Sequence, residues 1–256
     1  QRETLMRAAK MAEQHFGRID TWINNAGVAI YGRVHEASDE DNRRLFDTNY
    51  WGVVYGSLAA LPALERAGGG AIINVGSEVS DAVVPLQGMY SASKHAVKGF
   101  TDALYIELAD AKAPISVTLV QPTAVDTPYP EHARSYLDVE PKLPTPMIDP
   151  ERVANAILDA AEKPTQYAKV GLMAHVDSFT SRIAPRLGAL MARMQVSRQQ
   201  RDEPPRDPEG ALHRPSELTA GGAMRVRGRG DDNAAKGDAK RDIAEADRQR
   251  AQAKMS

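Results

Sequence analysis

The chain has 256 residues, of which 42% are hydrophobic, and its formal net charge at pH 7 is -2. A charge so close to zero gives no general attraction to nucleic acid or to an anionic membrane surface. The sequence has no cysteine, which excludes disulfide bonds and cysteine-ligated metals and makes the cytoplasm the expected location. No apolar run reaches the roughly 20 residues that a membrane-spanning helix needs, so we expect no membrane span.

The first elements form a pattern of helix, strand and glycine turn. Residues 1–16 have helical composition without an initiator methionine or a capping residue, so we expect that the chain is truncated at its N-terminus. Residues 19–23 are a short apolar run typical of a buried strand. This strand ends on Asn24-Asn25-Ala26-Gly27, where a glycine allows a ligand to approach the backbone closely.

Helices and strands then alternate along the chain. Residues 38–66 and 90–111 have apolar side chains at helical spacing, whereas residues 71–75 and 115–120 are short apolar runs typical of buried strands. Strands that alternate with helices predict an α/β fold, in which a doubly wound parallel sheet carries helices on both faces.

The whole chain is predicted to divide into a catalytic domain at 1–198 and a tail. Residues 128–150 hold several prolines and few apolar residues, which predicts a long loop that covers the pocket as a lid. A helix at 151–162 and a strand at 167–173 follow. The amphipathic segment at 178–194 is expected to pack in the core or between subunits, with a membrane surface as the alternative.

Residues 199–256 are rich in proline, glycine, alanine and charges of both signs. A segment of this composition cannot bury enough apolar area to offset its ordering entropy, so we predict a disordered charged tail. The Arg-Gly run at 225–230 is typical of some RNA-binding segments. Because acidic residues follow it directly, a solvated linker is the preferred interpretation, and we predict no nucleic-acid partner.

Several polar side chains are placed where chemistry can occur. Tyr90 and Lys94 are four residues apart on a predicted helix, so their side chains share one face, although this spacing alone is common. Ser77 lies just beyond a predicted strand, at the end where ligands bind in parallel sheets. Asn49 and Asn74 interrupt apolar patterns, where burial without a partner would be costly.

Together these pieces resemble the short-chain dehydrogenase/reductase family over residues 1–173. The matching segments are Asn-Asn-Ala-Gly at 24–27, Asn49 in Asn-Tyr-Trp-Gly, Ser77 after Ile-Ile-Asn-Val-Gly, Tyr90-Ser-Ala-Ser-Lys94, and Pro122 with Thr127. The resemblance implies a Rossmann-like sheet and an NAD(P)-dependent oxidoreductase that acts on CH–OH groups or carbonyls. Each segment is weak evidence by itself, but their shared order makes the resemblance specific.

The resemblance also implies a role for each residue of the site. Tyr90 would pass a proton to or from the substrate oxygen as general acid/base. Lys94 would stabilise the phenolate and donate to the nicotinamide ribose. Ser77 would donate a hydrogen bond to the substrate oxygen, with Ser80 as the alternative serine. Asn49 would hold a water molecule that links Lys94 to solvent.

The cofactor contacts that the resemblance implies lie on two segments: Asn25, Ala26 and Gly27 on the adenosine side, and Pro122, Val125 and Thr127 over the nicotinamide. The family's glycine-rich phosphate turn, Thr-Gly-x-x-x-Gly-x-Gly, is absent from this sequence, so the fold is expected to lack its first strands and to bind cofactor poorly. The residue that separates NAD from NADP is absent too, so either cofactor remains open. Thr123 stands where the family has glycine.

The partners follow from the same reasoning. We expect a small carbonyl or alcohol substrate, and the apolar residues at 82–86 indicate a lipophilic one. By resemblance, the parent enzyme is a dimer or tetramer joined through the helices at 38–66 and 90–111. The six histidines show no ligand spacing, so no metal site is expected. The rival hypothesis is a non-catalytic Rossmann scaffold that serves as an interaction protein, because the phosphate turn is absent.

Overall fold

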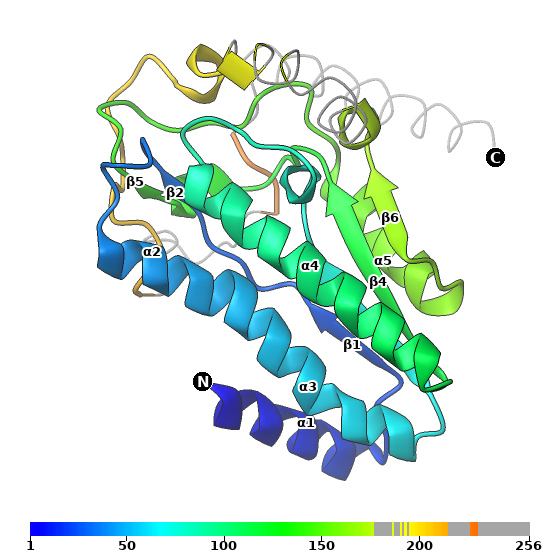
Figure 1. The fold of residues 1–256 in the computed structure, drawn as a ribbon. Coiled ribbons are helices and arrows are strands. Elements are labelled where there is room, and N and C mark those ends of the chain that lie inside the picture. The colour runs from blue at the N-terminus through cyan, green and yellow to red at the C-terminus, as the bar shows by residue number, and fades with distance from the viewer. Residues whose placement is uncertain (177–185, 187–189, 191, 194, 215–225, 230–256) are drawn as a thin grey trace, which may run out of the picture.

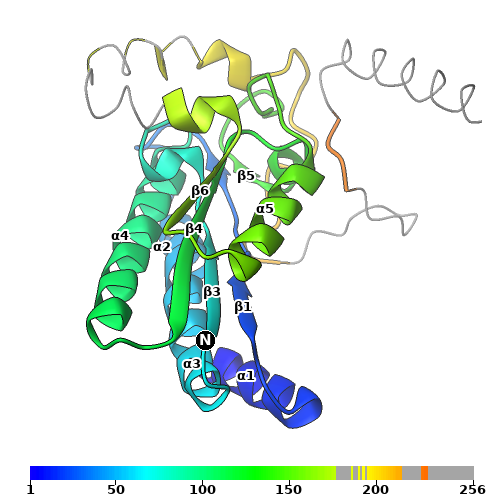
Figure 2. The ribbon, with the colours of Figure 1, turned by 90° about the vertical axis from the view of Figure 1, so that its right-hand side faces the viewer.

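The computed structural model describes residues 1–176, 186, 190, 192–193, 195–214 and 226–229. The main sheet is parallel and has four strands, in the order β1 (Thr21–Asn24), β3 (Gly70–Val75), β4 (Ile115–Pro122) and β6 (Tyr167–Val170). One face is covered by α1 (Arg2–Phe16), α3 (Gly52–Arg66) and α4 (Gly88–Asp110), and the other by α5 (Pro150–Glu162) (Figures 1 and 2). The predicted α/β architecture is therefore confirmed.

The alternation of side chains along the central strands explains the two helical layers. Successive strand residues point to opposite faces of the sheet. In β3, Ile72 packs into a cluster with α1, α3 and α4, whereas its neighbour Ile73 packs toward α5, and neither side chain is exposed. Strands covered on both faces must be apolar throughout, which is why the buried strands appear in the sequence as short apolar runs. Strand β1 is the edge of the described sheet, and Ile23 is 44% exposed there.

The helical run predicted at 38–66 contains an irregularity that the sequence did not indicate. It consists of α2 (Asp39–Phe46), a π-helical turn at Asp47–Trp51 and then α3. Ser38 caps α2, because its side chain accepts a hydrogen bond of 3.1 Å from the Asp41 backbone. The π-turn adds one residue to the helix, and such turns are frequent at functional sites.

A buried network of amides connects the strands to the helices. Asn24 at the end of β1 donates to Asn74 of β3 at 2.8 Å and to Ser57 of α3 at 3.0 Å. Asn74 donates in turn to Thr101 of α4 at 3.0 Å and is fully buried. The polar residue in the apolar pattern of β3 is therefore partnered, and burying it costs much less than burying a lone amide.

The segment at 128–150 is more ordered than the long loop we expected. It contains a 3-10 helix at Tyr129–His132 and strand β5 (Arg134–Ser135), which pairs in parallel with β2 (Ile30–Tyr31). A second, two-stranded sheet therefore joins this segment to the chain that follows β1. The pairing was missed because two-residue strands carry no detectable alternation.

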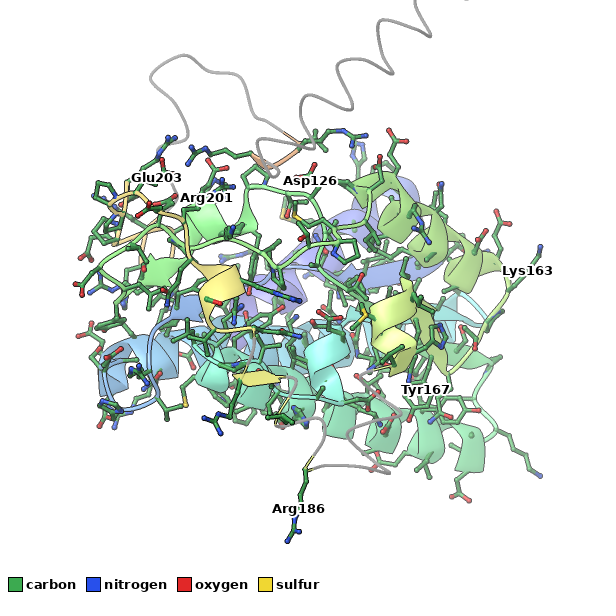
Figure 3. All side chains as sticks on the ribbon, turned by 90° about the horizontal axis from the view of Figure 1, so that it is seen from above. Asp126, Lys163, Tyr167, Arg186, Arg201 and Glu203 are labelled. Carbon is green, nitrogen blue, oxygen red and sulfur yellow. The ribbon has the colours of Figure 1, made fainter. Side chains whose placement is uncertain are left out.

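The expected disorder from residue 199 onward is wrong for residues 199–214. Gln199 and Leu212 are 0% and 1% exposed, and Arg44 donates to the Leu212 carbonyl at 3.0 Å. Arg201 and Glu203 lie on the same side of the molecule as Asp126, which follows β4 (Figure 3). The average composition of residues 199–256 predicts disorder, because a few buried side chains have little effect on an average over so many residues. The remainder of the predicted tail, apart from 226–229, and most of the segment at 178–194 lie outside the described residues.

Asp41 anchors both the segment at 128–150, which was predicted to be a lid, and the C-terminal segment, residues 199–214. Its carboxylate accepts from Arg134 at 2.9 Å and from Tyr136 at 2.6 Å, and it pairs with His213 at 2.7 Å. Burial alone would raise the pKa of Asp41, but the hydrogen bonds from Tyr136, His213 and Arg134 outweigh burial and lower it. One carboxylate therefore joins three segments that are distant in the sequence.

The amide network leads to a prediction about Gly56. A Cβ at this position would lie 2.1 Å from the Asn24 side-chain oxygen, which is held by its hydrogen bond to Trp22. Gly56→Ala must therefore displace Asn24, and we expect it to lower the free energy of unfolding by about 2 to 3 kcal/mol. Urea denaturation followed by circular dichroism measures the change.

Gly99→Ala is the matched control on α4. An added Cβ there has nothing within 4 Å. We expect a gain of about 0.5 to 1 kcal/mol, because alanine loses less backbone entropy than glycine in a helix. Equal effects of the two substitutions would show that Asn24 does not constrain Gly56.

Candidate active site

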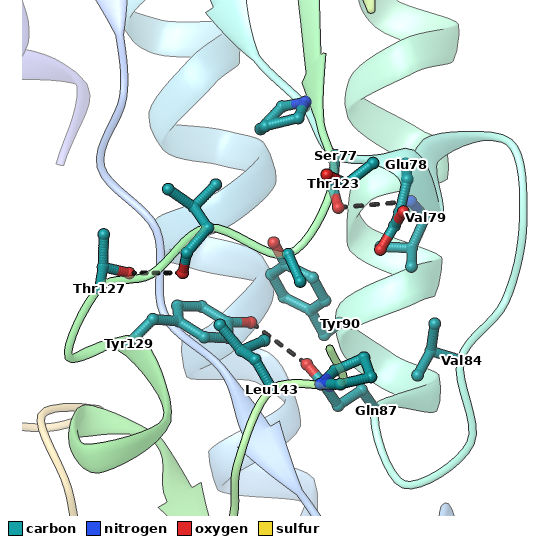
Figure 4. A pocket seen from close by; sticks show the side chains of 15 residues that line it. Ser77, Glu78, Val79, Val84, Gln87, Tyr90, Thr123, Thr127, Tyr129 and Leu143 are labelled. Atoms are coloured by element: carbon teal, nitrogen blue, oxygen red, sulfur yellow. Dashed lines mark hydrogen bonds between the residues drawn. The ribbon is translucent and has the colours of Figure 1, made fainter. Parts of the chain in front are cut away.

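The predicted site residues meet at the carboxyl edge of the sheet. Strands β1, β3 and β4 all end there, and each is followed by one of the segments identified in the sequence. A cavity of about 130 Å³ opens at this edge, lined by Ser77, Tyr90, Pro122, Val125 and Thr127 among others (Figure 4). Parallel pairing brings these residues together although they span a large part of the chain.

The two candidate serines have different surroundings. Ser77 follows β3 in an extended conformation, lines the cavity and accepts a hydrogen bond of 3.3 Å from the Val79 backbone. Ser80 is 1% exposed, and its hydroxyl accepts from the Ser77 backbone at 3.2 Å. The two serines thus form a reciprocal cap on the 3-10 helix at Glu78–Ser80, and of the two Ser77 is the one that lines the cavity.

Tyr90 lies in the first turn of α4 with its ring in the cavity wall. Burial raises the pKa of Tyr90 above its ordinary value, and the nearby Glu78 carboxylate adds to this effect. Hydrogen bonds from Tyr129 and Ser77 oppose the rise because they stabilise the phenolate. Ser77 and Tyr90, the two residues expected to hold a substrate oxygen, line the same cavity.

Lys94 lies one helical turn after Tyr90 and is only 4% exposed. Its ammonium nitrogen lies 5.7 Å from the centroid of the Tyr90 ring and donates to the Val75 carbonyl at 2.8 Å. Burial lowers the pKa of Lys94 to about 8. A Cβ on Gly27 would lie 3.9 Å from this nitrogen, so the segment after β1 reaches the lysine.

Asn49 lies inside the π-helical turn and is fully buried. Its side-chain oxygen accepts from the Val28 backbone at 2.8 Å, and its side-chain nitrogen donates to the Val28 carbonyl at 3.0 Å. The same nitrogen donates to Ser93 at 3.1 Å, and the Ser93 hydroxyl donates to the Tyr90 carbonyl at 2.7 Å. Asn49 therefore links the segment after β1 to the first turn of α4. Its role in holding a water stays a prediction.

The residues predicted to contact a cofactor lie on two segments. After β1 come the exposed residues Asn25, Ala26 and Gly27, and Pro122 at the end of β4, with Val125 and Thr127 after it, lines the cavity. The segment at 128–150 holds the second segment in place, because Val125 forms a backbone bridge with Ile148. Their contact with a cofactor stays a prediction.

Thr123, which stands where the family has glycine, fits without distortion. It is 7% exposed, and its backbone donates to the Val170 carbonyl at 3.0 Å. Its side chain packs over Gly171, where an added Cβ would lie 2.4 Å from the threonine hydroxyl. Gly171, which directly follows the neighbouring strand β6, therefore leaves the room that the Thr123 side chain occupies.

Sequence reasoning missed two polar residues of the cavity wall. The Tyr129 hydroxyl donates to the Gln87 side-chain oxygen at 3.3 Å (Figure 4). The rings of Tyr129 and Tyr90 meet edge to face, with centroids 5.7 Å apart. Tyr129 lies between two prolines in a segment without periodicity, so its position could not be inferred from the sequence.

Metal ligands and membrane spans are the two other features considered for the described residues. No three histidine, aspartate or glutamate side chains gather there in a way that could hold a metal ion. None of the helices in this part of the chain combines the length and the apolar character that crossing a lipid bilayer requires.

Comparison with known proteins identifies the family of this chain. The model of the short chain dehydrogenase family matches residues 1–137. A short chain dehydrogenase from Burkholderia cenocepacia, solved in complex with NADP, is 32% identical and superposes with a TM-score of 0.61 over 75% of this chain and 76% of its own. The chain therefore belongs to the short chain dehydrogenase family, a family of oxidoreductases.

Two relatives extend the comparison. The oxidoreductase YxnA of Bacillus subtilis is 42% identical over 231 residues, which cover 88% of this chain. This chain spans 63% of the length of YxnA. A 3-ketodihydrosphingosine reductase of Bacteroides thetaiotaomicron is 40% identical over 116 residues, which are 45% of this chain and 42% of that protein.

The burial of Lys94 predicts a pH dependence of stability. Between pH 8 and its usual pKa of 10.5, Lys94 has lost its proton in the folded chain but keeps it in the unfolded chain. Unfolding therefore takes up a proton, and stability from this group rises with pH. Relative to Lys94→Met, we expect the native chain to gain about 1 to 3 kcal/mol between pH 7 and pH 10 in urea denaturation.

Lys98→Met, one turn further along α4, is the control. Burial lowers the pKa of Lys98, but the hydrogen bonds that Lys98 donates to Asp102 and Tyr167 raise it overall. Lys98 therefore stays protonated in both states up to pH 10, and its difference from the native chain should be flat. A flat difference for Lys94→Met as well would contradict the depressed pKa of Lys94.

Proposed function

We propose that the protein is an NAD(P)-dependent oxidoreductase that transfers hydride between the nicotinamide and a carbonyl or hydroxyl carbon of a small molecule. The observation that most supports this function is that Ser77 and Tyr90, two residues with hydroxyl groups, line the same cavity at the carboxyl edge of the sheet. The ammonium of Lys94 lies behind the ring of the same tyrosine. A substrate oxygen placed between the hydroxyls would receive a hydrogen bond from each.

The protein supplies the proton and the orientation. When bound, a nicotinamide cofactor supplies or accepts the hydride. Tyr90 donates its phenolic proton to the substrate oxygen in reduction and recovers it in oxidation, while Ser77 holds the oxygen. Lys94 stabilises the phenolate that forms, because a cation near the ring favours the charged state.

The residues around Lys94 suit a nicotinamide ribose. An ammonium has three N–H donors, and among the described residues Lys94 makes one hydrogen bond, to the Val75 carbonyl. The other donors can bind the ribose hydroxyls. The Burkholderia relative was solved with NADP, which supports a nicotinamide cofactor here, and both NAD and NADP are candidates.

The cavity favours a lipophilic substrate. Its apolar lining includes Val79, Val84, Val125, Leu143 and Pro144. Pockets lined in this way bind apolar groups, while a few polar side chains fix the orientation of the ligand. The Bacteroides relative, whose name gives 3-ketodihydrosphingosine as its substrate, supports a keto group on such a molecule.

We also propose that the chain acts as a homo-oligomer in the cytoplasm. Large apolar side chains are exposed on the outer faces of the helices predicted to join subunits. They are Trp51, Leu58 and Ile106, with exposed fractions of 41%, 38% and 62%. Exposed apolar side chains that gather on a surface mark interaction sites. Sedimentation of the purified protein measures the assembly.

The test of the enzymatic function is Tyr90→Phe. We expect the protein to oxidise NADPH or NADH with a panel of medium-chain ketones and aldehydes. Removing the phenolic hydroxyl should lower kcat about a hundredfold or more, because no other group donates the proton. Tyr105→Phe, on the same helix but 37% exposed, should leave kcat unchanged.

The alternative function is a scaffold without catalysis, which the absence of the glycine-rich phosphate turn favours. Turnover that is equal in the native chain and in Tyr90→Phe would contradict the enzymatic proposal. Absence of both turnover and nicotinamide binding, measured by NADPH fluorescence, would favour the scaffold.

A further inference from the structure

The cavity is bounded at one end by two segments that are far apart in the sequence. Val84 and Gln87 come from the loop between β3 and α4, whereas Leu143 and Pro144 come from the segment after β5. In Figure 4, Gln87 and Leu143 lie at the edge of the cavity opposite Ser77, and we call this edge the distal end. A substrate that places its oxygen at Ser77 extends its carbon chain toward the distal end.

The main chain of Gln199 supports the wall that contains Leu143. Residues 199–203 pair with residues 140–142 in an antiparallel arrangement, through backbone hydrogen bonds of 2.8 to 2.9 Å. In one of these bonds, the Lys142 N–H donates to the Gln199 carbonyl at 2.9 Å. Lys142 directly precedes Leu143, so the pairing fixes where this side of the distal end lies.

The side chain of Gln199 supports the opposite wall. Its nitrogen donates to the Pro85 carbonyl at 2.9 Å, and its oxygen accepts from the Gln87 side chain at 2.8 Å. Because a carbonyl can only accept, the amide of Gln199 has one orientation that satisfies both partners. Both glutamine side chains are buried, so water does not compete for these bonds. One residue therefore joins the two walls, although it does not line the cavity itself.

The loop that Gln199 holds contains a strained residue. Leu86 lies between Pro85 and Gln87 with a φ of 65°, in the left-handed region that side chains with a Cβ rarely adopt. A strained residue of this kind persists only where the surrounding structure holds it. Gln199 bonds the residues on both sides of Leu86, and the Gly32 N–H donates to the Leu86 carbonyl at 2.8 Å. Without the bonds from Gln199, the loop relaxes and its wall moves outward.

We infer that Gln199 is a positioning residue that keeps the distal end of the cavity narrow and so limits the length of the substrate's carbon chain. The inference rests on the function proposed above. The cavity, of about 130 Å³, is smaller than the roughly 300 Å³ at which common ligand pockets begin. While both walls are held, a long carbon chain meets the side chains of Val84 and Leu143. Gln199 therefore selects among substrates through the residues that it holds.

Gln199→Met tests the inference, because methionine keeps the length of the side chain and removes both of its hydrogen bonds. The substrates are the straight-chain methyl ketones from butanone to decanone, reduced with NADPH or NADH. We expect kcat/KM for decanone relative to butanone to rise about tenfold, the effect of admitting one or more additional methylenes to an apolar pocket. The gain should appear in KM rather than kcat, because the substitution leaves Ser77, Tyr90 and Lys94 in place.

Gln200→Met is the matched control. It makes the same change one residue along the chain, where the main chain makes the bridge to Pro141, and it should leave the chain-length profile unchanged. Circular dichroism shows whether each variant folds. If Gln199→Met does not, Gln87→Met/Gln199→Met replaces it, because neither amide then stays buried without the other. Its reference is Gln87→Met, which has the same cavity lining and keeps the bond from Gln199 to Pro85, and relative to this reference the rise should again be about tenfold.

Hydrogen exchange measured by NMR reports on the loop without any turnover. The Gly32 N–H donates to the Leu86 carbonyl, so its exchange rate follows the opening of the loop. This rate should rise about tenfold in Gln199→Met and stay unchanged in Gln200→Met. The buried residue Ala71, at the amino end of β3, provides an amide that reports global unfolding.

A chain-length profile that is equal in Gln199→Met and the native chain would overturn the inference, as would a loss of kcat by the same factor for every ketone. If the native chain reduces no ketone, the proposed function fails, and ketone binding, followed through the NMR shifts of Gln87 and Leu143, decides the inference. Decanone should then bind Gln199→Met more tightly than the native chain, and equal binding would contradict the inference. If reduction depends on Tyr90 but all variants share one profile, the proposed function stands and the inference fails.

Discussion

The side-chain amide of Asn49 bonds both the N–H and the carbonyl of Val28, and the geometry of the site depends on this pair of hydrogen bonds. These two bonds hold the segment after β1 against the π-helical turn that carries Asn49. A further bond from Asn49 to Ser93 connects both of these segments to the first turn of α4, which carries Tyr90. An α-helix without the π-turn would place Asn49 one residue out of phase, with its amide turned away from Val28. The extra residue of the π-turn is therefore what lets one side chain serve three elements.

Burying polar side chains lowers stability unless they form hydrogen bonds, and most of the polar side chains buried near the site do form them. Asn74 and Asn24 satisfy each other and the neighbouring helices, so they add specificity at little loss of stability. Lys94 differs. Its burial lowers the pKa of the ammonium, and among the described residues its one hydrogen bond is to the Val75 carbonyl. Residues that serve a site rather than the core commonly carry such a cost. An incompletely satisfied lysine beside a cavity is thus better explained by ligand binding than by folding.

The sequence predicted the parts of this structure that repeat or alternate. Apolar runs located β1, β3 and β4 to within two or three residues, because buried parallel strands need continuous apolar side chains. Helical spacing placed Tyr90 and Lys94 on one face. What escaped prediction depends on single long-range contacts, such as the β2–β5 pairing and the burial of Gln199. Such contacts leave no local pattern, so composition alone mistook the start of the C-terminal segment for disorder.

The boundary of the family match has a structural meaning. It ends at residue 137, after Asn49, Ser77, Tyr90 and Lys94, whereas Gln199 and the rest of the C-terminal segment lie beyond it. The side chains proposed to react therefore come from the shared scaffold, whereas Gln199, which bonds the cavity residue Gln87, comes from a region that the family model does not match. Loops and termini tolerate sequence change better than packed strands do. The support of the cavity wall can thus change while the four side chains proposed to react stay the same.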